Sequence, residues 1–158
     1  MSSKTLCAFV RFAAIATAVC GLALCCYVYP FRLSDLIGWN PGLGGGYIWL
    51  VYLWAASAPC FVILVYVWKV SNAIQRDEVF TQKTAKWIKT AATILLADVG
   101  FFAVGGFALL LAGLNRPGIL FLSLLGCIFG ISLALLAAVL ARYISKAALL
   151  QEEADGTI

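Results

Sequence analysis

Long apolar stretches alternate with short polar segments along the chain. Four stretches carry at most one charged residue each, and they cover residues 12–29, 47–68, 90–114 and 118–141. The hydrocarbon core of a bilayer is about 30 Å thick, so roughly 20 helical residues cross it. Only helices and closed barrels satisfy their backbone groups inside lipid. The pattern therefore predicts an all-α fold, in which residues 1–158 form a single bundle of four transmembrane helices.

The segments that join the predicted spans are polar or rich in helix breakers. Residues 30–46 end in the run Gly44-Gly45-Gly46 and are expected to form an irregular outer loop. Residues 69–89 form a charged loop, in which Thr81 is the expected N-cap of the helix that enters the third span. Residues 142–158 form a polar tail after the fourth span.

The composition indicates a membrane protein, and the distribution of charge indicates its orientation. The 158 residues are 64% hydrophobic and 11% charged, with a mean hydropathy of +1.02, whereas a soluble domain is about half apolar and a quarter charged. Of the eleven Lys and Arg residues, nine lie on one side of the predicted spans, and only Arg32 and Arg116 lie on the other. Because loops rich in Lys and Arg stay in the cytoplasm, both termini and the 69–89 loop are expected there. The net charge of +4 is thus a topological signal, and we expect no nucleic-acid partner.

Small residues recur every four positions on two of the predicted spans. The fourth span carries Gly126, Gly130, Ala134 and Ala138, and the first carries Ala13, Thr17 and Gly21. Rows of small residues at this spacing let two helix backbones approach closely. The rows therefore predict one of two contacts: with each other within one chain, or of one row with a second copy in a homo-oligomer. The sequence leaves both arrangements open.

A single acidic residue, Asp98, interrupts the third span nine residues after Lys89. Nine residues make about 13 Å of helix, which places the carboxyl group near the bilayer midplane. An Asp at that depth costs at least about 2.5 kcal/mol on insertion scales, so it should face protein or water. No Lys, Arg or His lies in any predicted span. We therefore expect Asp98 to be largely protonated and to donate a hydrogen bond. The candidate acceptors at similar depth are Ser57, Ser132 or a backbone carbonyl freed near Pro59.

Asp98 has two interpretations that lead to different functions. In the first, which we favour, the side chain is a polar clasp between helices and has no chemical role. In the second, it binds a proton or cation in the path of a small dimeric, proton-coupled transporter. The spans contain no second charged residue that would support a proton relay.

The residues needed for catalysis, metal binding or cofactor binding are missing. The chain has no His and no C-x-x-C spacing among its six cysteines, which leaves little to build a zinc site on. A lone intramembrane Asp cannot form the dyad of an aspartyl protease. We therefore expect a non-enzymatic protein with no catalytic residues, metal or cofactor.

Charged residues near the predicted cytoplasmic surface are candidates for contact with lipid or with a protein partner. Three lysines, Lys83, Lys86 and Lys89, precede the third span, and three acids, Glu152, Glu153 and Asp155, lie in the tail. Lysines at the end of a transmembrane helix suit contact with anionic lipid headgroups. The acidic tail and the basic loop are both expected to be available to a cytoplasmic protein.

Two short motifs are distinctive. The first is Arg76-Asp77-Glu78-Val79-Phe80-Thr81 before the third span, and the second is the ending Leu150-Gln151-Glu152-Glu153-Ala154-Asp155-Gly156-Thr157-Ile158. Together with the four hydrophobic spans, they resemble a family of bacterial integral membrane proteins, domain of unknown function 2975. Gly156 departs from the pattern, because the family usually has an apolar residue there. The resemblance implies a multi-pass protein of the bacterial cytoplasmic (inner) membrane. Members are often encoded beside small helix-turn-helix regulators, so the resemblance also implies a regulatory or interaction role with a cytoplasmic partner.

Overall fold

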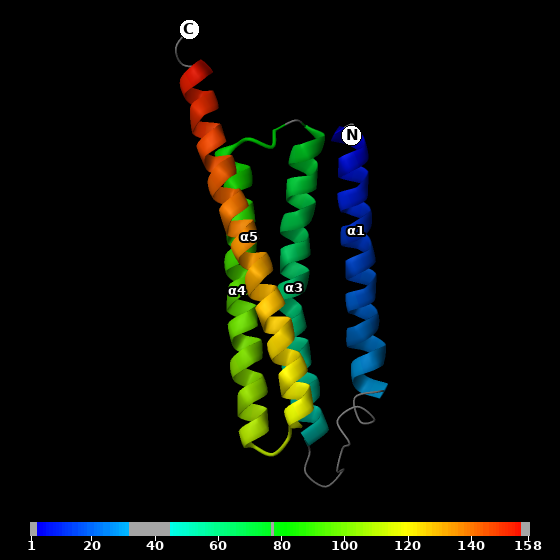
Figure 1. Ribbon diagram of the computed structural model, residues 1–158. Helices are drawn as coiled ribbons and strands as arrows, with labels where there is room; N and C mark the ends of the chain where they lie inside the picture. The colour runs from blue at the N-terminus through cyan, green and yellow to red at the C-terminus, as the bar shows by residue number, and fades with distance from the viewer. Residues whose placement is uncertain (1–2, 32–44, 77, 156–158) are drawn as a thin grey trace.

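The structure, a computed structural model, describes residues 3–31, 45–76 and 78–155. Its elements are α1 (Ser3–Ala23), the π-helical continuation η1 (Leu24–Val28), α3 (Gly45–Gln75), α4 (Gln82–Leu111) and α5 (Pro117–Asp155) (Figure 1). Most of the predicted outer loop, residues 32–44, lies outside the described residues, as do the last three residues of the tail.

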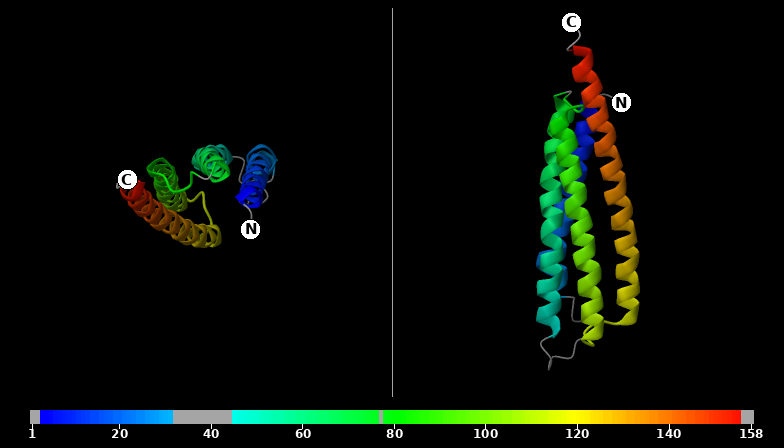
Figure 2. Two further views of the ribbon diagram at one scale, coloured as in Figure 1. Left: turned by 90° about the horizontal axis from the view of Figure 1, so that it is seen from above. Right: turned by 90° about the vertical axis from the view of Figure 1, so that its left-hand side faces the viewer.

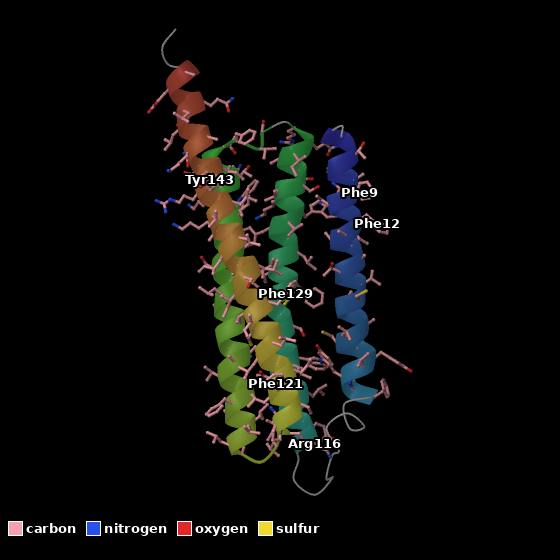
Figure 3. The ribbon with its side chains drawn as sticks, in the orientation of Figure 1. Phe9, Phe12, Arg116, Phe121, Phe129 and Tyr143 are labelled. Carbon is pink, nitrogen blue, oxygen red and sulfur yellow. The ribbon has the colours of Figure 1, made fainter. Side chains whose placement is uncertain are left out.

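Four helices in the described part of the chain are long and apolar enough to cross a membrane, namely Cys7–Phe31, Tyr47–Gln75, Gln82–Leu111 and Pro117–Ala154. Large apolar side chains cover their outer surface. Phe12, Phe121 and Phe129 are each at least two-thirds exposed (Figure 3). Rings left uncovered in such numbers need an apolar surrounding. The predicted all-α class with four membrane-spanning helices is confirmed.

The helices continue well beyond the apolar runs that predicted them. Helix α5 has 39 residues, or about 58 Å at 1.5 Å per residue, against a hydrocarbon core of about 30 Å. In the described residues, the predicted 69–89 loop is helical apart from residues 76 and 78–81, and the predicted tail is helical as far as Asp155. The reason is that neither segment contains Gly or Pro before Gly156, so nothing interrupts the backbone hydrogen bonding where the apolar residues end.

Helices α1, α3 and α4 stand side by side in a curved row, and α5 lies across α4 (Figure 2). The contacts follow the chain order: α1 packs on α3, α3 on α4, and α5 most extensively on α4. Both described ends of the chain lie at the same end of the molecule as the turn between α3 and α4 (Figure 1). This arrangement is an open one, because α1 has no large contact with α5 to close the row.

Residue-level signals explain both ends of α4. Thr81 has extended backbone angles (φ −124°, ψ 150°), and its hydroxyl oxygen accepts a hydrogen bond from the backbone N–H of Thr84 at 3.3 Å. The predicted N-cap at Thr81 is therefore confirmed. At the other end, Gly113 adopts a positive φ of 71°, and its N–H donates to the carbonyl of Leu110 while Leu114 donates to Leu109. This pair of bonds is the Schellman arrangement that glycine permits at a helix end.

The α4–α5 contact follows a heptad seam, which corrects the predicted four-residue row. Seven of the buried or half-buried positions of α5 are spaced alternately by three and four residues: Cys127, Gly130, Ala134, Ala137, Ala141, Ile144 and Ala148. Gly130 and Ala134 lie on this seam, but Gly126 and Ala138 are exposed. Each step of four residues turns a helix by about 40° beyond a full turn, so a strict four-residue row winds off the contact face.

The predicted row on the first span is only partly a packing face. Ala13 and Thr17 are exposed, while Gly21 is half-buried. A Cβ atom added at Gly21 would lie 3.2 Å from Cζ of Phe61 on α3, so glycine permits the close approach of these two helices. Because α1 packs on α3 and α5 on α4, the two small-residue rows do not meet within one chain.

Candidate functional site

Asp98 lies on the side of α4 that faces α3. Its neighbour on the same face is Gly105, where an added Cβ atom would overlap the ring of Tyr52 on α3. One carboxylate oxygen of Asp98, Oδ2, accepts a hydrogen bond from Sγ of Cys60 on α3 at 3.6 Å. The other, Oδ1, is buried and has no hydrogen-bond partner in the described part of the chain. The acid thus bridges two helices through one oxygen and leaves the second unsatisfied.

The two serines predicted as partners of Asp98 bond elsewhere. The hydroxyl of Ser57 donates to the carbonyl of Leu53 at 2.7 Å, and that of Ser132 donates to the carbonyl of Ile128 at 2.9 Å. Serine within a helix commonly satisfies its hydroxyl on the carbonyl four residues earlier. Ser132 is also exposed on α5. The prediction that these serines pair with Asp98 is corrected by these contacts.

Cys60 is the partner that sequence reasoning missed, although the sequence contained a signal for it. Asp98 is nine residues from Lys89, and Cys60 is nine residues from Lys69. Helices α3 and α4 are antiparallel neighbours (Figure 1), so equal distances from the flanking lysines place the two side chains at equal depth. Ser57, twelve residues from Lys69, lies almost a full turn deeper.

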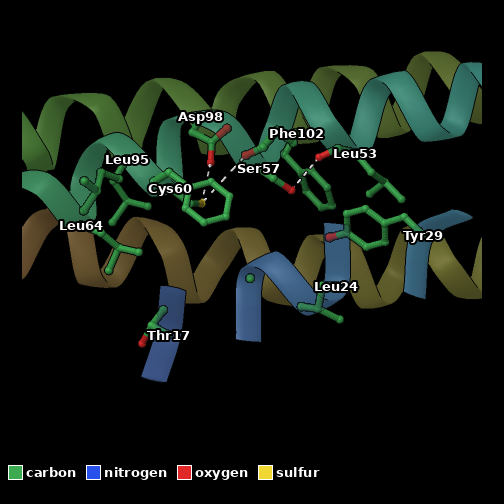
Figure 4. A pocket seen from close by; sticks show the side chains of 14 residues that line it. Thr17, Leu24, Tyr29, Leu53, Ser57, Cys60, Leu64, Leu95, Asp98 and Phe102 are labelled. Atoms are coloured by element: carbon green, nitrogen blue, oxygen red, sulfur yellow. Dashed lines mark hydrogen bonds between the residues drawn. The ribbon is translucent and has the colours of Figure 1, made fainter. Parts of the chain in front are cut away.

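A cleft of about 490 Å³ opens beside Asp98. Its walls come from α1 with its continuation to Tyr29, from α3 and from α4 (Figure 4). The lining residues are Thr17, Gly21, Leu24, Tyr29, Leu53, Ala56, Ser57, Cys60, Phe61, Ile63, Leu64, Leu95, Asp98 and Phe102. They include one carboxyl group and no Lys or Arg. The site is therefore an apolar cleft with a single acid at one wall.

Aromatic contacts fix the wall formed by Phe102. The ring of Tyr52 stacks on that of Phe102, with centroids 5.5 Å apart, and the Tyr52 hydroxyl donates to the Phe102 carbonyl at 2.6 Å. Trp49 meets Tyr52 edge-on and donates its indole N–H to the carbonyl of Leu114 at 2.7 Å. With Leu109, Trp49 and Tyr52 form a buried core. This core holds α3 against α4 immediately beside the cleft.

The first-helix wall of the cleft lies where the helix widens. Leu24–Val28 form a π-helix, whose hydrogen bonds span five residues and which is often found at functional sites. The carbonyl of Cys25 in this turn accepts a hydrogen bond from the indole N–H of Trp54 on α3 at 3.1 Å. The contact ties η1 to α3 on the side away from Asp98's helix. Nothing in the apolar sequence pattern predicted the π-helix.

The residues predicted for lipid or partner contact lie at the end of the molecule that carries both termini: Lys83, Lys86, Lys89, Glu152, Glu153 and Asp155. All are exposed except Asp155, whose side chain lies outside the described ones. The ammonium group of Lys83 lies 5.4 Å from the ring centre of Trp87, and that of Lys69 lies 5.9 Å from the same ring. Cation–π contacts of this kind are worth about 0.5–1 kcal/mol at exposed sites.

Metal-ligating residues do not gather in the part of the chain that the structure describes. Within residues 3–31, 45–76 and 78–155, no group of three or more His, Cys, Asp or Glu side chains is positioned to hold a metal ion. The six cysteines are free thiols. What the site offers chemically is a carboxyl group, a neighbouring thiol and aromatic walls.

The comparisons with known proteins agree with the family that the sequence resembles. The model of the family described as protein of unknown function (DUF2975) matches residues 12–158, nearly the whole chain. No curated protein and no solved structure matches it. This multi-pass membrane protein therefore belongs to the DUF2975 family.

Proposed function

We propose that the protein is a non-enzymatic membrane component that binds a cytoplasmic regulatory protein through the C-terminal end of α5, from Leu149 onwards. The observation that carries the proposal is the length of this helix. Ser145 and Gln82 are joined by hydrogen bonds of 2.8 and 3.0 Å, so the residues that follow Ser145 run past the start of α4. The end of α5 projects beyond the other helices (Figure 1).

The projecting end is apolar on its outer surface. Leu149 is 50% exposed and Leu150 is 67% exposed. They follow Arg142 and Lys146, the first cationic residues after the apolar run of α5, and such residues mark the headgroup level. Leucines beyond that level face water, where uncovered apolar surface is unfavourable by about 25 cal/mol per Å². A protein that covers them would remove this penalty.

The charge next to the leucines indicates the chemistry of the partner. Glu152 and Glu153 are exposed in the following turn. A helix that presents two leucines and two acids suits a hydrophobic groove with a basic rim. This proposal agrees with the regulatory role that the family resemblance implies.

Photo-crosslinking in cells tests the proposal. A photoreactive residue at Leu150 is expected to capture one defined cytoplasmic protein, whereas the same residue at Leu125 is not. Leu125 is 59% exposed on the same helix but lies within the membrane-spanning part. The captured protein should then bind the purified membrane protein, and Leu149→Glu with Leu150→Glu should abolish binding. Equal capture from both positions, or binding that survives the double substitution, would refute the proposal.

A second function, a small dimeric proton-coupled transporter, is favoured by the cleft at Asp98. Transport needs a group that binds the coupled ion within the span, and a carboxyl beside a cleft provides one. Asp98→Asn keeps the shape of the side chain but cannot ionise, while Asp98→Glu keeps the acid. Proton-coupled flux in reconstituted vesicles should be lost in the first variant and retained in the second. Flux that is the same in the Asn variant and the wild type would exclude this function.

A further inference from the structure

Among the described residues, none with a positive charge lines the cleft beside the carboxyl group of Asp98. Every Lys and Arg of the chain lies outside the apolar runs that predicted the spans. Cys60 is bonded to Oδ2, and Oδ1 is buried without a partner in the described residues. An ionised carboxylate buried in this way is costly unless it is paired. The neutralising charge must therefore come from a proton or from a ligand.

The walls of the cleft disfavour an inorganic cation. Ca²⁺ and Mg²⁺ need six or more oxygen ligands at short distance, and among the described residues Asp98 is the only carboxylate in the lining. The hydroxyls of Ser57 and Thr17, which also line the cleft, are turned to the carbonyls of Leu53 and Ala13 on their own helices. The remaining lining is largely hydrocarbon and aromatic. The lining of the cleft therefore suits an organic ligand that is mostly apolar and has one small polar group.

Aromatic rings stand on each wall of the cleft. Tyr29 follows η1, Phe61 is on α3 and Phe102 is on α4, and all three are at least partly covered by protein. Faces of aromatic rings attract cations, the more strongly where water is excluded. A neutral acyl chain would contact the same walls, but it would leave the second oxygen of Asp98 without a partner. The volume of about 490 Å³ lies in the range of about 300–1,000 Å³ that is usual for small-molecule sites.

We infer that this cleft binds a hydrophobic organic cation, with its charged group against Asp98 and its apolar body between α1, α3 and α4. The inference goes beyond the proposed partner role. It also names the substrate class of the transporter that is our second candidate, but binding does not depend on transport. A protein that binds the cation without flux would retain the inference and exclude only the transporter.

Binding of two probe cations tests the inference. The full chain in phosphatidylcholine nanodiscs is dialysed against tetraphenylphosphonium and, separately, benzyltrimethylammonium, with empty nanodiscs as the blank. Saturable binding of at least one cation is expected. Asp98→Asn should weaken it by at least about tenfold, because neither probe can donate a hydrogen bond and both lose their Coulombic attraction to an ionised carboxylate at short range. Asp98→Glu should retain most of it.

A matched pair of variants tests whether binding takes place in the cleft. Thr17 lines the cleft and is exposed on α1, whereas Ala13, one turn away on the same helix, is exposed but does not line it. Thr17→Phe should therefore block binding and Ala13→Phe should not. Circular dichroism and gel filtration establish that each variant is folded.

Three results would overturn the inference. One is the absence of saturable binding of either cation to the wild type. Another is equal binding to the wild type and to folded Asp98→Asn, which would mean that only the apolar lining is recognised, as for a neutral lipid chain. The third is equal binding to Thr17→Phe and Ala13→Phe, which would place the cation outside the cleft.

Discussion

Two opposing contributions to the free energy of folding meet at the carboxyl group of Asp98. Its bond to Cys60 joins α3 to α4, but hydrogen bonds between membrane helices average only about 0.6 kcal/mol. Its second oxygen is buried without a partner among the described residues, and an unsatisfied buried polar group is unfavourable by about 1–3 kcal/mol. The second effect is larger. We therefore predict that the acid contributes little to the free energy of folding.

Removing the carboxyl group should consequently not weaken the protein. Asp98→Ala is expected to leave the free energy of unfolding unchanged or to raise it by about 1 kcal/mol, because the residue borders an open cleft and its loss creates no closed cavity. Denaturant titration in bicelles measures this change. Ser57→Ala, which also borders the cleft, is the matched control and should have little effect. Destabilisation by Asp98→Ala of more than 1 kcal/mol would restore the clasp interpretation.

Gly105 is required by the close approach of α3 and α4. An added Cβ atom would overlap the ring of Tyr52, whereas the same atom at Gly100 meets nothing within 4 Å. Tyr52 cannot easily move, because its hydroxyl is bonded to Phe102 and its ring belongs to the buried core. We expect Gly105→Ala to destabilise the protein by about 1–3 kcal/mol. Thermal unfolding in detergent measures it, with Gly100→Ala as the neutral control; equal effects of the two would show that the contact is not tight.

At the scale of helices, the sequence indicated which segments cross the membrane but not where the helices end. Apolar runs report the thickness of lipid, and they located all four spans. They carry no information about polar residues that continue a helix into water, as residues 69–75 and 142–155 do. The thiol of Cys60 was missed for a related reason. Depth relative to the flanking lysines, and not hydroxyl chemistry, decides which side chain reaches Asp98.

The heptad seam between α4 and α5 predicts different roles for Gly130 and Gly126, although both belong to the four-residue row that the sequence predicted. A Cβ atom at Gly130 would lie 2.6 Å from Cγ2 of Val99, while Gly126 is exposed and meets nothing within 4 Å. Gly130→Leu should therefore force the helices apart and lower stability by about 1–3 kcal/mol. Gly126→Leu should be tolerated in the monomer. Unfolding in bicelles compares the two variants, and equal destabilisation would contradict the seam.

The same pair of variants bears on assembly. Gly126 and Ala138 are exposed on α5, so within one chain they have no packing role. If a second copy packs on this face, Gly126→Leu should shift the mass measured by light scattering in detergent from dimer to monomer while the unfolding of the monomer is unchanged. An unaltered mass would exclude an interface at Gly126.

For the whole molecule, orientation is the property on which the partner proposal depends. The turn between α3 and α4, the start of α1 and the end of α5 lie at one end of the molecule (Figure 1). Nine of the eleven Lys and Arg residues belong to the segments at this end, and the exceptions are Arg32 and Arg116. Phe80 is 57% exposed at this end, and Gly118 is exposed at the opposite one. The positive-inside rule predicts that Phe80 lies in the cytoplasm and Gly118 outside.

Single cysteines at these two positions decide the orientation. The six native cysteines are first replaced, since all are free thiols. In spheroplasts, a membrane-impermeant maleimide should label Gly118→Cys. It should label Phe80→Cys only after the membrane has been permeabilised. The reverse result would place the leucines and acids at the end of α5 on the outside, beyond the reach of any cytoplasmic protein. The cleft at Asp98 would be unaffected, because its depth in the bilayer is the same in either orientation.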